Sequence, residues 1–385
     1  MDFNLNSDQR QFVDLASQFA SEQLTPFAAE WDENHHFPKD VIAAAGELGF
    51  CALYCPVSEG GMGLSRLDSA IIFEELAKGC TSTTAMITIH NMATNMVTTL
   101  GTPELRQAWS EPLTSGQKLA SYCLTEPASG SDAASLQTKA IKDGNEYIIS
   151  GTKVFISGAG ATELLVVMCR TGDDSVKGIS AIAIPADAKG VSYGKPENKM
   201  GWNAQPTCSV TFENVRVPIT HLLGNEGDGF TFAMKGLDGG RINIATCSIG
   251  TAQAALDRAI DYMNERQQFG KPLATFQGLQ FKLADMATEL VAARQMVRLA
   301  AFKLDTGDPE TTAYCAMAKR FATDVGFSVC DQALQIHGGY GYIREYPLER
   351  YVRDVRVHQI LEGTNEIMRL IIARRLLDEH CGMIV

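Results

Sequence analysis

The sequence predicts an α+β fold, with a middle β-domain between an N-terminal helical domain and a C-terminal helical bundle. Apolar residues recur at helical spacing in residues 1–115. Short β-rich runs separated by Gly and Asp fill residues 116–226, and helical spacing returns in residues 227–385. Helices that flank a block of strands, rather than alternate with single strands, indicate this class instead of repeated βαβ units. We therefore expect three domains with these boundaries.

The N-terminal domain is expected to contain helices alone. Ser7 begins the first one, because Phe12 and Phe19 follow at helical spacing. Pro38 opens the second, since helices tolerate Pro in the first turn. Further helices are expected at residues 69–77 and 82–100.

The middle domain is predicted to be a compact antiparallel β-domain, because runs rich in Val, Ile, Phe and Tyr alternate with turn residues. The predicted strands cover residues 147–149, 154–156, 164–168, 179–184, 209–212 and 215–217.

The C-terminal domain is predicted to be a helical bundle. Its Ala-rich stretches favour close helix packing and could also form an oligomer interface. The predicted helices cover residues 242–263, 276–305, 310–336 and 364–377.

Composition limits the classes of function. The formal net charge of −12 argues against a nucleic-acid surface, which requires clustered Lys and Arg. Ten Cys are scattered without a CxxC pair, so we expect reduced, buried cysteines and no metal site. No apolar run is long enough to span a membrane, and residues 1–6 lack a secretory signal pattern. We expect a cytoplasmic protein, or a mitochondrial matrix protein if the chain is a processed organellar form.

Two glycine-containing segments are not nucleotide-binding motifs. Gly158-Ala159-Gly160 is followed by Glu163 where the dinucleotide fingerprint requires a third Gly, and β-strand residues follow instead of a helix. Gly270 and Lys271 lack the spacing of a phosphate-binding loop.

Two segments could carry chemistry, and each has a structural alternative. The loop at residues 124–132 is rich in hydroxyls and small residues, which permit close approach to a ligand, but it could be an ordinary polar turn. Glu362 follows an apolar run, where desolvation would raise its pKa and suit it to act as a general base. It could instead be an acid that the N-terminus of the next helix favours. His90 is expected to be structural.

Four separated segments, taken together, resemble the acyl-CoA dehydrogenase family, and the resemblance covers residues 5–380. They occur in the order and spacing of the family, and the helix–sheet–helix zoning agrees. The segments are Tyr122-Cys123-Leu124-Thr125-Glu126-Pro127 with Gly130-Ser131-Asp132, Arg266-Gln267-Gln268-Phe269-Gly270, Gln335-Ile336-His337-Gly338-Gly339-Tyr340-Gly341, and Leu361-Glu362-Gly363-Thr364.

The resemblance implies bound FAD, with part of each site supplied by a neighbouring subunit of a homotetramer. Residues 266–277 and 335–339 would reach the FAD of that neighbour. The residues expected to bind FAD are Tyr122, Leu124, Thr125, Gly130, Ser131, Phe155, Ile156, Ser157, Arg266, Phe269, Phe276, Gln277, Gln335, Ile336, His337, Gly338, Gly339, Thr364, Asn365 and Glu366.

The resemblance also implies the catalytic base and the substrate contacts. Glu362 matches the usual base, and the position that serves some relatives instead is Gly240, which cannot act. Ala128 replaces a Gly found in many relatives, and we expect it to be tolerated if its φ is negative. The expected substrate-binding residues are Ser131, Asp238, Gly239, Gly240, Arg241 and Arg374.

The implied reaction is α,β-dehydrogenation of a short branched acyl-CoA, with electrons passed to an electron-transfer flavoprotein. Several segments look most similar to the members that oxidise isobutyryl-CoA, and Gly239-Gly240 would leave room for an α-methyl branch. Straight short-chain and 2-methylbutyryl substrates are alternatives. A non-catalytic acyl-CoA-binding protein and an oxygen-reducing oxidase are more distant ones.

Overall fold

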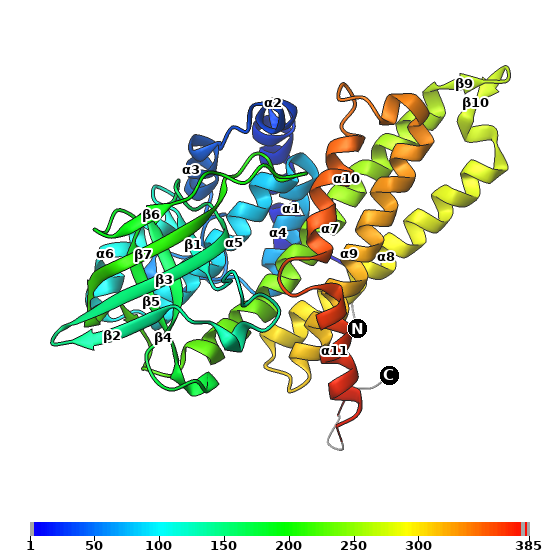
Figure 1. The fold of residues 1–385 in the computed structure, drawn as a ribbon. Coiled ribbons are helices and arrows are strands. Elements are labelled where there is room, and N and C mark those ends of the chain that lie inside the picture. Colours follow the sequence, from blue (N-terminus) through cyan, green and yellow to red (C-terminus); the bar gives the residue numbers. More distant parts are fainter. Residues whose placement is uncertain (1–3, 379–381, 383–385) are drawn as a thin grey trace.

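The computed structural model describes residues 4–378 and residue 382. A helical part, a sheet and a helical bundle follow one another along the chain, and the sheet and the bundle lie on opposite sides of the molecule (Figure 1). The predicted α+β class is confirmed. The exact domain boundaries stay a prediction.

The N-terminal helices begin where side chains can cap them. Asn6 and Gln9 form a capping box at the first helix, Ser65 caps the fourth, and Thr102 with Pro103 starts the sixth. The helices are α1 (Ser7–Phe19), α2 (Ala28–Asn34), α3 (Lys39–Glu47), α4 (Arg66–Gly79), α5 (Thr81–Leu100) and α6 (Pro103–Thr114).

The middle part is one sheet in the order β6-β7-β3-β2-β4-β5-β8, with β1 paired to β4. Most pairings are antiparallel, as expected. Two are parallel: β1 pairs with β4, and β2 pairs with β4 through a single residue pair. The strands are β1 (Ala120–Cys123), β2 (Lys139–Asp143), β3 (Glu146–Ser157), β4 (Leu164–Arg170), β5 (Ile179–Pro185), β6 (Val191–Tyr193), β7 (Thr207–Pro218) and β8 (Leu222–Leu223).

Two strands are longer than the sequence indicated. The runs expected at 147–149 and 154–156 are one strand, β3, and those at 209–212 and 215–217 are one strand, β7. Register shifts in the β3–β7 pairing interrupt the apolar alternation. These irregularities explain why each strand looked like two in the sequence.

The C-terminal part is a bundle of long helices. It comprises α7 (Gly229–Glu265), the hairpin β9 (Gln267–Gln268) and β10 (Lys271–Pro272), α8 (Gln277–Asp305), α9 (Thr311–His337), α10 (Leu348–Arg356) and α11 (Asn365–Leu376). Small buried residues such as Ala252, Ala293 and Ala318 let α7, α8 and α9 pack closely.

One expected helix start is wrong. Helix α7 begins at Gly229 rather than at residue 242, so Gly239, Gly240 and Arg241 lie inside the helix. Each Gly lowers helix propensity by about 1 kcal/mol relative to Ala. Burial of this stretch against other elements outweighs that local preference.

Other expectations concern buried polar groups. The nine cysteines among the described residues are buried and unpaired, while Cys381 lies outside those residues. His90 is structural, as predicted: its Nε2 lies 2.8 Å from the Leu113 carbonyl oxygen and its Nδ1 accepts from the Ala120 amide. No helix within residues 4–378 is long and apolar enough to cross a membrane.

Candidate active site

Glu362 occupies a sharp turn between the short 3₁₀ helix at Val357–Gln359 and α11. Its φ is 57° and that of Gly363 is 86°, so two successive residues are left-handed. Thr364 then caps α11, because its hydroxyl accepts from the Ile367 amide. The turn directs the Glu362 side chain away from α11 and toward α7.

The Glu362 carboxylate lies against the glycine pair of α7. A Cβ placed on Gly240 would be 2.5 Å from Glu362 Oε2, so the missing side chain makes the space that the carboxylate fills. Oε2 is buried and has no hydrogen-bond partner among the described residues. A buried carboxylate oxygen without a partner is costly unless a bound molecule completes the site.

The environment of Glu362 makes it a weaker acid. Burial raises its pKa from 4.5 to about 7, although Arg241 and Lys319 act in the opposite direction. The Tyr122 hydroxyl is also buried without a partner among the described residues. Burial and the nearby Glu362 charge raise the pKa of Tyr122. The site therefore combines a carboxyl group whose pKa is raised to about 7 with a nearby hydroxyl that has no partner among the described residues.

Asp238 and Arg241 form a buried pair one helical turn apart beside Glu362. Arg241 Nη1 donates to Asp238 Oδ1 at 2.7 Å, and Thr312 donates to Asp238 Oδ2 at 2.7 Å. Arg241 Nε has no partner among the described residues. This arrangement fixes a cation at the wall of the site and leaves one of its donors available.

The space expected beside Gly239 and Gly240 is not open. A Cβ on Gly239 would lie 1.4 Å from Arg66 Nη2, and the Gly240 side is filled by Glu362. The Arg66 guanidinium stacks over the Tyr54 ring, 3.6 Å from its centroid. The missing side chains therefore make room for the Arg66 guanidinium and the Glu362 carboxylate, and the idea that they also accommodate a branched acyl chain stays a prediction. Sequence reasoning missed Arg66 and Tyr54, because nothing near them in the chain links them to α7.

A buried ion pair between Glu126 and Lys153 stabilises the loop at residues 124–132 from its buried side. Lys153 Nζ donates to Glu126 Oε1 at 2.8 Å and to the Leu124 carbonyl at 2.9 Å. The Glu126 carboxylate also accepts from the amides of Gln137 and Thr138. Sequence reasoning missed Lys153, although a lone Lys inside a β-rich run was a usable signal.

The surface of this loop is accessible to a ligand. Gly130, Ser131 and Phe155 are exposed, with φ of Phe155 at 57°. Ala128 is not among the residues with positive φ, so its methyl group is tolerated as expected. Of the other residues predicted to bind FAD here, Ile156 is buried, and Tyr122, Leu124, Thr125 and Ser157 are partly buried.

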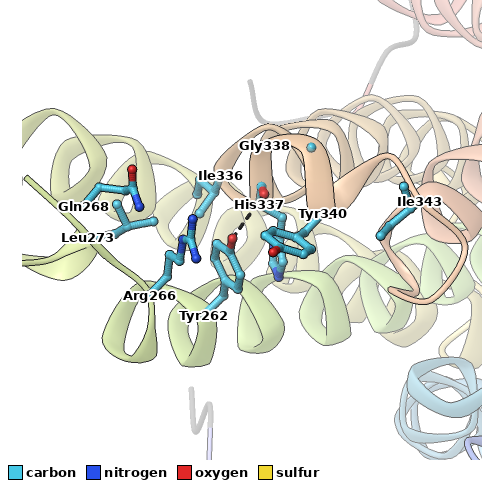
Figure 2. Close-up of a pocket in the computed structure, with 10 residues that line it drawn as sticks. Tyr262, Arg266, Gln268, Leu273, Ile336, His337, Gly338, Tyr340 and Ile343 are labelled. Carbon is cyan, nitrogen blue, oxygen red and sulfur yellow. Dashed lines mark hydrogen bonds between the residues drawn. The ribbon is translucent and has the colours of Figure 1, made fainter.

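The second predicted set lies at the other end of the molecule. Arg266, Ile336, His337, Gly338 and Gly339 line a surface pocket of about 470 Å³ (Figure 2). Phe269 is 93 % exposed at the tip of the β9–β10 hairpin, which projects away from the sheet (Figure 1). Its ring packs against Phe276, while Gln277 and Gln335 are exposed.

The remaining predicted residues lie around α11. Thr364 caps that helix, and Glu366 and Arg374 are exposed on it. The Asn365 side chain forms hydrogen bonds with Lys319, Thr323 and Asp324, and its expected contact with FAD stays a prediction.

Comparisons with known proteins identify the class. Models of the acyl-CoA dehydrogenase N-terminal, middle and C-terminal domains match residues 6–117, 121–215 and 227–377. The chain is 52 % identical to the mitochondrial isobutyryl-CoA dehydrogenase of Bos taurus, over 97 % of this chain and 90 % of the relative. It is 53 % identical to that of Dictyostelium discoideum, over 98 % and 91 %.

A solved structure agrees along the whole fold. A chain in the structure described as the electron transferring flavoprotein of Acidaminococcus fermentans superposes with a TM-score of 0.96 and 41 % identity, covering 98 % of this chain and all of that one. The chain therefore belongs to the acyl-CoA dehydrogenase family, and it is an FAD-dependent oxidoreductase.

Proposed function

We propose that the protein dehydrogenates isobutyryl-CoA to methacrylyl-CoA, with Glu362 as the base. The observation that carries the proposal is the Glu362 carboxylate, whose Oε2 is buried without a partner beside Gly240. The two isobutyryl-CoA dehydrogenases at 52 % and 53 % identity support the choice of acyl chain.

The residues of the site suit removal of a weakly acidic proton next to a thioester. Glu362 takes the α-proton, and its raised pKa brings its basicity closer to what that proton requires. The unpartnered Glu362 Oε2 is the atom proposed to receive the proton. Bound FAD supplies the acceptor for the β-hydride.

The residues present fit FAD, provided that two subunits contribute to each site. The exposed Phe155 and Gly130–Ser131 offer one surface, and the pocket lined by Arg266 and His337 offers another. The first surface belongs to the loop after β1 and the end of β3, and the second lies where the β9–β10 hairpin leaves the bundle (Figure 1), so we propose that a second chain brings them together. We propose the homotetramer on this ground.

The electron acceptor and the compartment are also proposals. A neighbour described as an electron transferring flavoprotein supports an electron-transfer flavoprotein as the acceptor. The mitochondrial relatives from Bos taurus and Dictyostelium discoideum support the mitochondrial matrix over the cytoplasm. Valine breakdown is a fitting pathway.

Anaerobic flavin bleaching tests the proposed function. FAD-loaded protein is mixed separately with isobutyryl-CoA, butyryl-CoA and 2-methylbutyryl-CoA, and the visible flavin absorbance is followed. Fastest bleaching with isobutyryl-CoA is expected. Fastest bleaching with either alternative would overturn the substrate assignment, and no bleaching with any of them would overturn dehydrogenation of short acyl-CoA thioesters.

A further inference from the structure

Lys319 on α9 is a lysine whose side chain is fully buried, with 0 % exposure. Its buried neighbours on the same helix include the apolar Ala318 and Ala322 and one polar residue, Thr323. Lys319 Nζ donates to the Gly363 carbonyl at 2.8 Å and to Asn365 Oδ1 at 2.9 Å. A buried ammonium group is costly without such partners. Because the side chain is not exposed, any effect on a ligand is transmitted through the segment that it holds.

That segment is the turn that carries Glu362. Left-handed φ is unfavourable for a residue with a side chain, so the surrounding structure must hold Glu362 in it. Lys319 donates one hydrogen bond to the Gly363 carbonyl, immediately after Glu362. It donates another to the side chain of Asn365, the first residue of α11. The segment between Glu362 and α11 is therefore hydrogen-bonded to α9 at both of its ends.

We propose that Lys319 is a positioning residue for Glu362. Its two hydrogen bonds hold the left-handed turn that directs the carboxylate into the space beside Gly240, and its positive charge favours the ionised carboxylate. The proposal rests on the proposed role of Glu362 as the base.

The charges around Glu362 decide the sign of the electrostatic effect. Arg241 faces it from α7, Lys319 from α9 and the Tyr122 hydroxyl from β1. Lys319 itself faces Arg241 as well as the acids Asp324 and Glu366, and burial lowers its pKa to about 7. Removal of the Lys319 charge takes away one of the two cations that oppose the effect of burial, so the pKa of Glu362 should rise further.

Three variants separate the effect of the two Lys319 hydrogen bonds, here called the clamp, from the effect of the Lys319 charge. Lys319→Met removes both, whereas Lys319→Gln keeps a hydrogen-bond donor without the charge. Thr323→Val is the matched control, because Thr323 contacts the same Asn365 side chain but carries no charge. FAD content and thermal unfolding establish that each variant is folded.

Two measurements are made as a function of pH. One is the rate of anaerobic bleaching with isobutyryl-CoA, and the other is the infrared band of the Glu362 carboxyl without substrate, identified by its loss in Glu362→Gln. In both measurements, Lys319→Met should raise the midpoint of the pH titration by about one pH unit. It should also lower the limiting rate about 100-fold through misplacement of the base. Lys319→Gln should keep the midpoint shift and lose less rate, and Thr323→Val should change neither.

The outcomes distinguish the two proposals. Folded Lys319→Met or Lys319→Gln with a wild-type infrared midpoint overturns the role of the charge. A wild-type limiting rate in Lys319→Met overturns the role of the clamp. If Lys319→Met does not fold, Lys319→Gln is the test, because it is expected to shift the midpoint and lose some rate, and a folded variant unchanged in both overturns the proposal. Absence of bleaching in the wild-type protein contradicts the proposed function instead, while the infrared titration still tests the coupling of Lys319 to Glu362.

Discussion

Glu362 Oε2 lies where the side chain of residue 240 would begin, 2.5 Å from a Cβ built on Gly240. The left-handed turn before α11 directs the Glu362 carboxylate toward α7, and the absence of a side chain at Gly240 leaves the space that the carboxylate occupies. A change at either position should disturb the base while leaving the bulk of the fold intact.

Gly240→Ala should slow bleaching without unfolding the protein. The methyl group would meet the end of a flexible side chain, so Glu362 can move aside at the cost of its alignment with the substrate. A misplaced catalytic group can lower the rate about 100-fold. Stopped-flow bleaching measures the effect. Gly236→Ala on the same helix is the control, because its methyl group would meet only Met92 and Met96 atoms at 3.7 Å or more. Equal rates in the two variants would contradict the steric relationship.

Glu362→Gln should abolish bleaching and stabilise the protein above pH 7. The folded-state pKa is raised to about 7 from 4.5, so the folded protein binds the proton more tightly than the unfolded chain. The stability that this protonation contributes is present below pH 4.5 and is lost as the pH rises through 7. Gln has no proton to lose, and it should gain ~3 kcal/mol in free energy of unfolding at pH 8 relative to wild type. Urea unfolding at pH 4.5 and 8 measures this, and an equal difference at both values would contradict it.

The rate of bleaching should rise with pH around neutrality. Glu362 must be ionised to accept a proton, and its pKa in the protein without substrate is raised to about 7. The pH dependence of kcat/KM reports groups of the free enzyme, so it should show a midpoint near 7. A midpoint near 4.5 would mean that Glu362 is exposed to water in solution or is not the base.

Lys153→Met should destabilise the protein and weaken retention of FAD. The substitution leaves the buried Glu126 carboxylate without its cation and releases the Leu124 carbonyl behind the loop at residues 124–132. Breaking a buried ion pair from one side costs about 3–5 kcal/mol. Thermal unfolding and the ratio of flavin to protein after gel filtration measure the two effects. Lys142→Met on the exposed part of β2 is the control, and equal behaviour of the two variants would show that the ion pair does not support the loop.

Phe281→Glu should dissociate the proposed tetramer and reduce FAD binding together. Phe281 is 61 % exposed on α8, where Val291 and Phe302 are also more than half exposed, and such apolar surface typically lies in an interface. Light scattering and flavin content measure both quantities. Ile141→Glu on β2, with 63 % exposure of the original side chain, is the control. A monomer that retains FAD fully would contradict the shared site.

The sequence by itself determined the order of the parts and most of the helices. Helical spacing from Ser7 and a capping residue such as Thr364 act through neighbours in the chain, so they can be read without the fold. The four separated segments indicated the class through their resemblance to a family, without any knowledge of the fold. Strand runs within β3 and β7 were located, but the irregular pairing that joins them depends on the opposite strand.

Only the tertiary structure decided what surrounds Glu362. Gly239 and Gly240 looked like open space in the sequence, whereas Arg66 and Glu362 fill it from distant segments. In the sequence, nothing distinguishes Lys319 from other residues of a helix, whereas in the structure its ammonium group donates to the Gly363 carbonyl. Burial, pKa and close packing depend on groups far apart in the chain, so local pattern cannot supply them.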